Sequence, residues 1–199
     1  MTSDLDAARR ALWERQGSGA RYDAPEAPTD ALRLARSGTA YFARRLNALA
    51  DAALYEPSTV SGWTRAHVIC DLAYQARALA RQAEAATAGA TIPAMYDGSA
   101  GRGAEIRLGA TLPAHALRHL FDHAAVHLNV VWRDLPRAAW DIVAPDARGI
   151  PRPLRAAVTE RARRLWRGAL ELDNGARRRD LPLELLEDDP TGQHKGCSR

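Results

Sequence analysis

The sequence predicts an all-α protein, an up-down four-helix bundle. Four long stretches repeat apolar residues every three or four positions, which is the spacing of one helix face. No stretch shows the apolar–polar alternation of a convincing strand, and glycine and proline mark the breaks between the four stretches. Four amphipathic helices without a sheet must bury their apolar faces against one another, as they do in a bundle.

One main domain is expected. The chain has 199 residues and is 46% hydrophobic, which is enough for one sizeable core. The predicted bundle spans residues 29–187. A helical N-terminal arm and linker, residues 1–28, precede it, and the polar tail 188–199 has no core-forming pattern and is expected to be disordered.

The boundaries of the helices follow from their caps and breakers. The predicted helices run from Thr29 to about Leu54, from a Thr64 cap to Gly89, from near Pro113 to just before Pro136, and from about Leu154 to Asp173. Residues 91–110 lie between the second and third helices and show no regular pattern. We expect them to form a long irregular loop, and such a loop is a candidate for binding.

Composition narrows the classes of function. The formal net charge is +4, yet 24 acidic residues are interspersed with 28 basic ones, so a small anion is a better partner than nucleic acid. Two cysteines do not make a disulfide framework, no apolar run approaches a membrane span, and the first residues lack the apolar segment of a signal peptide. A cytoplasmic protein with a small-molecule substrate, and with neither nucleic acid nor a membrane as partner, is expected.

Four segments, taken in order, carry a family likeness. They read ARSGTAYFARRL, SGWTRAHVICDLAYQARAL, IPAMYDGSAGRGAEIRLGATL and ALRHLFDHAAVHLNVVWR. Over roughly residues 33–186 the chain resembles the mycothiol-dependent maleylpyruvate isomerases. The resemblance implies a DinB-like four-helix bundle whose second and fourth helices supply a histidine, a glutamate and a histidine to one zinc. It also implies a reaction that uses a thiol cofactor and isomerises a cis double bond, so zinc and mycothiol enter only by family analogy.

The positions that match the family's zinc ligands carry other residues here. The family has a histidine four residues after the position of His67, where this chain has Asp71, and its other two ligands match Arg164 and Gly168. A guanidinium and a glycine offer no electron pair to zinc, so no metal and no cofactor are expected. If these positions still converge, Asp71 and Arg164 should form a salt bridge in place of the metal. Gly168 would leave a gap. Either a ligand fills this gap, or the glycine is the result of simple drift.

Further candidates surround these three positions. Arg102 matches an arginine that the family uses near its active site and is a candidate for binding a substrate carboxylate, with a solvated loop arginine as the alternative. Glu171 continues the Arg164 stripe of its helix and Trp63 is a candidate pocket wall. His67 is expected to be a first-turn surface histidine.

Histidines recur every four residues on the third predicted helix, at His115, His119, His123 and His127. The first two are expected to point away from the core, whereas His123 and His127 approach its edge. His127 is the candidate proton carrier and His123 a candidate substrate contact. A metal bound by this stripe is the alternative.

Members of the family usually continue into a smaller α/β domain, whereas this sequence finishes with EDDPTGQHKGCSR. We expect that domain to be missing and the N-terminal arm to cover the cleft instead.

Three hypotheses of function follow. The first is a repurposed, metal-independent enzyme of the isomerase, lyase or cyclase type, acting on a small conjugated substrate in specialised metabolism. Its catalytic residues would be Asp71, Arg164 and His127. The second is a zinc- and mycothiol-dependent isomerase. The third is a non-catalytic bundle that binds a ligand and forms a homodimer through its N-terminal arm.

Overall fold

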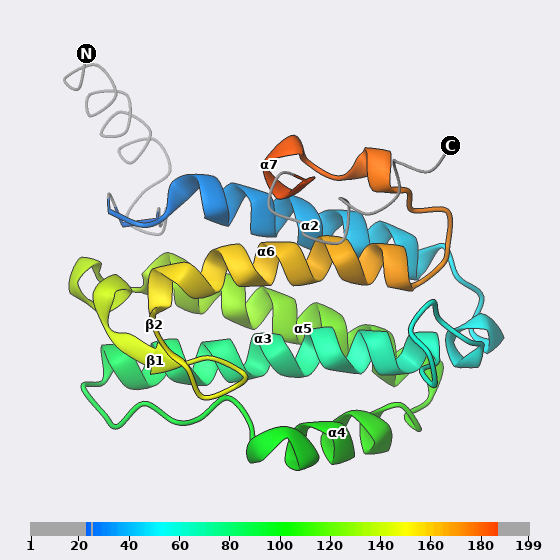
Figure 1. The fold of residues 1–199 in the computed structure, drawn as a ribbon, viewed down its shortest axis with the longest axis horizontal. Helices are drawn as coiled ribbons and strands as arrows, with labels where there is room; N and C mark the ends of the chain where they lie inside the picture. Colours follow the sequence, from blue (N-terminus) through cyan, green and yellow to red (C-terminus); the bar gives the residue numbers. More distant parts are fainter. Residues whose placement is uncertain (1–22, 25, 187–199) are drawn as a thin grey trace, which may run out of the picture.

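The computed structural model describes residues 23–24 and 26–186, and it confirms the four-helix bundle (Figure 1). The long helices are α2 (Thr29–Asn47), α3 (Arg65–Thr87), α5 (Ala114–Asp134) and α6 (Leu154–Glu171), with α4 (Gly98–Gly109) outside α3 and the short α7 (Leu183–Leu186) near the end of the described chain. The predicted helix in the N-terminal arm and the tail 188–199 lie outside the described residues. No described helix is both long enough and apolar enough to span a membrane.

The bundle core forms because each long helix has an apolar face. The helices pair most closely as α2 with α6 and α3 with α5, and α3 also packs against α6. Helix α3 is the central element, since most of its residues are buried, and many of them are alanines that let neighbouring helices approach closely. Phe42 of α2 and Phe121 of α5 are both buried and their ring centroids lie 4.7 Å apart. Because α3 packs against α6 in this core, residues of these two helices can meet.

The first predicted helix is too long. Helix α2 ends at Asn47, and residues toward Leu54 form the separate 3-10 turn η1 (Ala52–Tyr55). The reason is tertiary, because Arg118 of α5 donates hydrogen bonds of 2.8 Å to the carbonyl oxygens of Leu46 and Leu49. Arg118 thus binds one carbonyl in the last turn of α2 and one just beyond it, and it stabilises the turn of the chain at the helix end.

The predicted loop 91–110 is also corrected, because its second half is helix α4. Three glycines lie inside this helix after the positive-φ Gly98, which weakens the periodic signal. Tertiary packing compensates: Ile106 is buried, and a Cβ on Gly109 would lie 2.9 Å from the Cys70 sulfur of α3. Helix α4 thus lies directly against α3, and this places Arg102 on a helix instead of a loop.

The sequence does not predict the two short strands, because each has only three residues. Strand β1 (Val143–Pro145) pairs antiparallel with β2 (Pro151–Pro153), and the 3-10 turn η2 (Arg137–Asp141) precedes them. The turn η3 (Arg178–Asp180) follows α6. Gln82 of α3 donates a hydrogen bond to the Pro145 carbonyl oxygen of β1, and Tyr41 of α2 donates one to Asp180 of η3. These small elements thus pack against the long helices and leave the bundle architecture unchanged.

Candidate functional site

Asp71 is the centre of a buried polar cluster. It lies on α3, its side chain is only 1% exposed, and each of its carboxylate oxygens meets an arginine. Arg164 Nε of α6 donates to Oδ2 at 2.7 Å, and Arg102 Nη2 of α4 donates to Oδ1. The predicted Asp71–Arg164 salt bridge is therefore confirmed. Three helices contribute to the cluster, and the carboxylate ties α4 to the bundle.

Arg164 is held from two sides. Besides Asp71, its Nη1 atom lies 2.8 Å from Glu171 Oε2, close enough for an ion pair, although the angles do not suit a hydrogen bond. Both residues are on α6 and their side chains are mostly buried, at 17% and 15% exposed. The stripe predicted for α6 therefore does point into the cluster, and Glu171 positions the Arg164 guanidinium.

Gly168 adjoins the cluster but does not leave the expected gap. A Cβ atom there would lie 2.8 Å from Leu72 Cδ1 and 3.3 Å from Arg164 Nη1. The Leu72 side chain and the guanidinium therefore fill the space in which we expected a ligand. Gly168 is needed for this close approach of α6 to α3, and a contact with substrate at this position stays a prediction.

A further arginine completes the charge distribution. Arg161 of α6 is 2% exposed, and its Nη1 donates to the Leu72 carbonyl oxygen at 2.7 Å and to Gln75 Oε1 at 2.9 Å. Burial and the nearby positive charge of Arg164 together lower the pKa of Arg161 to about 9. Within the described residues no carboxylate forms an ion pair with Arg161. The cluster thus contains three guanidinium groups and two carboxylates, so one positive charge, that of Arg161, is in excess.

Tyr96 borders the same charges from the segment before α4. The Arg102 guanidinium carbon lies 5.4 Å from the centroid of its ring. Burial raises the pKa of Tyr96 to about 12, and the negative charge of Asp71 acts in the same direction. The phenol is therefore protonated at neutral pH and is available as a hydrogen-bond donor.

His67 lies in the first turn of α3, about one helical turn before Asp71, and Trp63 lies just before the helix, about two turns before Asp71. The Thr64 backbone N–H donates to His67 Nδ1 at 3.2 Å, so His67 belongs to the capping box of the helix. Burial lowers the pKa of His67, and Arg107 of α4 adds to this. Trp63 is half-buried and its ring centroid lies 6.0 Å from that of His67. Trp63 packs against the apolar cluster that includes Leu72 and Leu165, and its role as a pocket wall stays a prediction.

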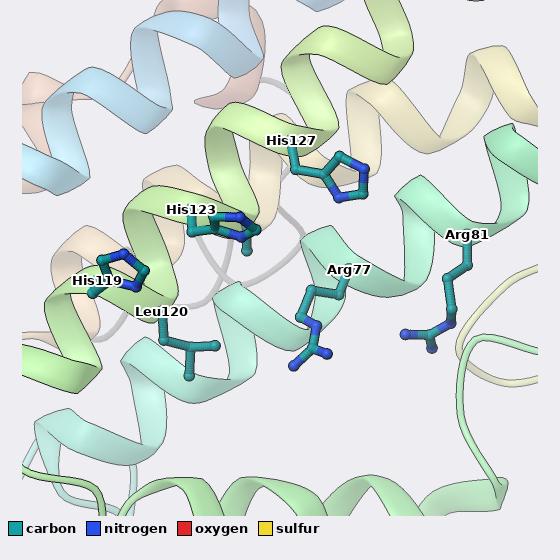
Figure 2. A pocket seen from close by; sticks show the side chains of 7 residues that line it. Arg77, Arg81, His119, Leu120, His123 and His127 are labelled. Atoms are coloured by element: carbon teal, nitrogen blue, oxygen red, sulfur yellow. The ribbon is translucent and has the colours of Figure 1, made fainter.

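The structure does not bring His127 and His123 to the Asp71 cluster, which corrects the expectation of one shared site. His127 Nε2 lies 2.8 Å from Glu84 Oε1 on α3. Glu84 follows Asp71 by thirteen residues, about 20 Å along the helix axis. His123 and His127 line a separate groove between α3 and α5, shown in Figure 2. His127 is therefore too far away to exchange a proton directly with Asp71.

The fold and the cluster together define a DinB-like helical bundle with a polar site between α3, α4 and α6. The family model of the mycothiol maleylpyruvate isomerase N-terminal domain matches residues 35–172, and the chain belongs to this family. This membership confirms the resemblance read from the sequence.

Solved structures agree with this assignment. The structure of mycothiol-dependent maleylpyruvate isomerase and that of a histidine-to-alanine mutant of it each match with 35% sequence identity and a TM-score of 0.77. Each match covers 80% of this chain and 66% of the other chain, so the present chain spans just under two thirds of the length of those proteins. No curated protein matches the sequence.

The residues of the cluster do not fit a zinc ion of the kind that the family implies. Asp71 is the one possible donor among the three matched positions, and both of its oxygens are engaged by guanidinium groups. Across residues 23–24 and 26–186, no group of three or more histidine, cysteine, aspartate or glutamate side chains is arranged to hold a metal ion. A catalytic zinc needs about three protein ligands, so no step of the proposed chemistry is routed through a metal.

Sequence reasoning missed Arg161 and Tyr96. A signal for Arg161 was present, because it follows Ala157 and precedes Leu165 at helical spacing on the apolar face of α6. An arginine on such a face must find partners inside the protein. No sequence pattern around Tyr96 indicated a role in the cluster. Tyr96 reaches the cluster because the segment before α4 folds back over α3.

Proposed function

We propose that this protein is a metal-independent enzyme of the isomerase, lyase or cyclase type whose Asp71 cluster binds a small conjugated anion. The observation that carries the proposal is the excess positive charge next to the Asp71–Arg164 pair. A buried guanidinium without a carboxylate partner is costly, and an anionic substrate would compensate it.

Access to the cluster is best from the side of α4. The Arg102 side chain is 37% exposed, compared with 17% for Arg164 and 1% for Asp71. Helix α4 packs mainly against α3. A substrate carboxylate arriving here would compete with Asp71 for the Arg102 guanidinium, and bidentate binding of a carboxylate by arginine is favourable.

The residues of the cluster would act by binding and by polarising the substrate. Asp71 orients the two arginines and has no free oxygen for taking a proton. Arg164 is fixed by Asp71 and Glu171 and can stabilise negative charge that develops on a substrate carbonyl oxygen. The protonated Tyr96 hydroxyl can donate a hydrogen bond to the same kind of oxygen. Such stabilisation of an enolate-like state would lower the barrier to rotation about a conjugated double bond.

The experiment combines metal analysis with a ligand probe. The protein is purified, dialysed, and measured for zinc by elemental analysis, and its thermal midpoint is recorded with and without a chelator and with increasing fumarate or maleate. We expect less than stoichiometric metal, no effect of the chelator, and a saturable rise of the midpoint with at least one dicarboxylate. Arg102→Gln should abolish this rise, whereas Arg167→Gln, an exposed arginine of α6, should retain it. Stoichiometric zinc, or no response to either dicarboxylate, would contradict the proposal.

A second candidate is a mycothiol-dependent maleylpyruvate isomerase activity, which family membership and 35% identity to that enzyme favour. An assay of maleylpyruvate isomerisation with and without mycothiol and zinc separates the two. Turnover that requires both additions supports the second candidate. Activity that survives the chelator supports the first.

A further inference from the structure

A groove lies between α3 and α5, away from the Asp71 cluster. Its volume is about 480 Å³, which is within the range of small-molecule sites. It is lined by Arg77 and Arg81 of α3 and by His119, Leu120, His123, Ala124 and His127 of α5. Figure 2 shows the three histidines in a row along α5, with the two arginines extending from the facing helix. Two rows of nitrogen-bearing side chains therefore border one space.

Both rows have an ordered geometry. The rings of His119 and His123 are stacked with centroids 5.9 Å apart, and the centroids of His123 and His127 are 6.3 Å apart. Arg81 Nη2 donates to the Met95 carbonyl oxygen at 3.1 Å, which fixes the guanidinium at the rim of the groove. The Arg77 guanidinium carbon lies 6.0 Å from the centroid of the Tyr74 ring. Such support reduces the side-chain entropy that a ligand must overcome.

The charge of the groove is unbalanced. One carboxylate, that of Glu84 of α3, contacts His127 at the end of the histidine row. In the described part of the chain, no carboxylate forms an ion pair with Arg77 or Arg81, whereas many other arginines of the bundle do have such partners. Between the two rows lie Leu120 and Ala124, which give the groove an apolar floor.

We propose that this groove binds a small organic anion. Arg77 and Arg81 neutralise its phosphate or carboxylate group, and imidazole N–H groups of the α5 row donate hydrogen bonds to its oxygens. Its apolar body packs on Leu120 and Ala124. Metal binding by the histidine row is the weaker explanation, because no suitable group of three donors exists in the described chain. The proposal does not rest on the function proposed for the Asp71 cluster.

The test is a titration followed by the histidine ring signals in two-dimensional NMR spectra, at constant ionic strength. Phenyl phosphate and benzoate are the two organic probes, and inorganic phosphate shows what the apolar body adds. We expect saturable shifts of His119, His123 and His127, with at least threefold tighter binding of phenyl phosphate than of inorganic phosphate. His115 is on the same helix but does not line the groove, so its signal should stay in place. A stronger response to benzoate would identify a carboxylate as the preferred group.

Variants decide whether the groove is responsible. Arg77→Gln with Arg81→Gln should weaken binding at least tenfold, whereas Arg167→Gln should change it less than twofold. All three arginines are exposed, so the thermal midpoint of each variant should remain close to that of the parent protein. Linear shifts without saturation, equal movement of His115, or unchanged binding in the double variant would overturn the proposal. Because the histidine signals report on the groove alone, failure here leaves the Asp71 cluster untouched.

Discussion

Replacing Asp71 by asparagine should destabilise the protein strongly, because the carboxylate is buried and forms ion pairs with two arginines. Asparagine keeps the size of the side chain, so the change removes charge with little change in packing. The three arginines respond differently: Arg102 is 37% exposed and can turn toward solvent, and Arg164 keeps Glu171 as a partner. Arg161 is 2% exposed and stays buried.

Removing one partner of a buried ion pair costs about 3–5 kcal/mol. Since two of the arginines have an alternative, we expect the low end, about 3 kcal/mol. For a protein of this length such a loss lowers the thermal midpoint by about 6–12 °C. Urea unfolding followed by circular dichroism gives the free energy directly. Asp122→Asn, which changes an exposed aspartate of α5, is the control and should cost less than about 0.5 kcal/mol.

A double-mutant cycle tests the cause of the loss. If Asp71 acts through Arg164, then Asp71→Asn combined with Arg164→Met should cost less than the sum of the two single changes, by about 1–2 kcal/mol. A loss below about 1 kcal/mol for Asp71→Asn, or strict additivity in the cycle, would refute the view that this carboxylate holds the cluster together.

Three other changes test other parts of the structure. Gly38→Ala should lower the free energy of unfolding in urea by about 2 kcal/mol, because the new Cβ would lie 2.9 Å from Trp166 Nε1 and the indole is held in the core. An unchanged free energy of unfolding would mean that the indole can move. Because the pKa of His67 is lowered in the folded protein, the unfolded chain binds a proton at this histidine more readily. The free energy of unfolding should therefore fall as the pH drops below the usual histidine pKa of about 6.5. His67→Gln should make this dependence on pH weaker. Burial raises the pKa of Cys70 to about 12, so in a Cys197→Ser background Ellman's reagent should react only after unfolding; rapid labelling of the native protein would show that α4 opens readily.

The long helices were predictable because their signals are local. Thr64 caps α3 as expected, and α5 begins directly after Pro113. The first helix was predicted too long because Arg118, seventy residues away, supplies the bonds that end α2 at Asn47. Helix α4 was missed because its glycines lower helix propensity, and only the packing against Cys70 and Tyr74 compensates.

The site divides in the same way. The pairing of Asp71 with Arg164 could be predicted from positions matched to a known family, since the helices keep their relative placement. The separation of His127 from that pair could not, because periodicity gives the face of α5 but not its neighbour along α3. A burial pattern on one helix contains no information about which part of another helix lies opposite.

By itself the sequence determined the fold class, the family, and the presence of Asp71, Arg164 and Gly168 at the positions that match the family's zinc ligands. Helix periodicity and residue identity are properties of short segments, so they can be read without the tertiary structure. Only the tertiary structure decided that Arg102 shares Asp71 with Arg164, that Arg161 has no carboxylate partner within the described chain, and that the histidine row faces Arg77 and Arg81. Each of these depends on how α3 meets α4, α5 or α6. Such contacts arise when many weak apolar contacts close the bundle together, and no single segment encodes them.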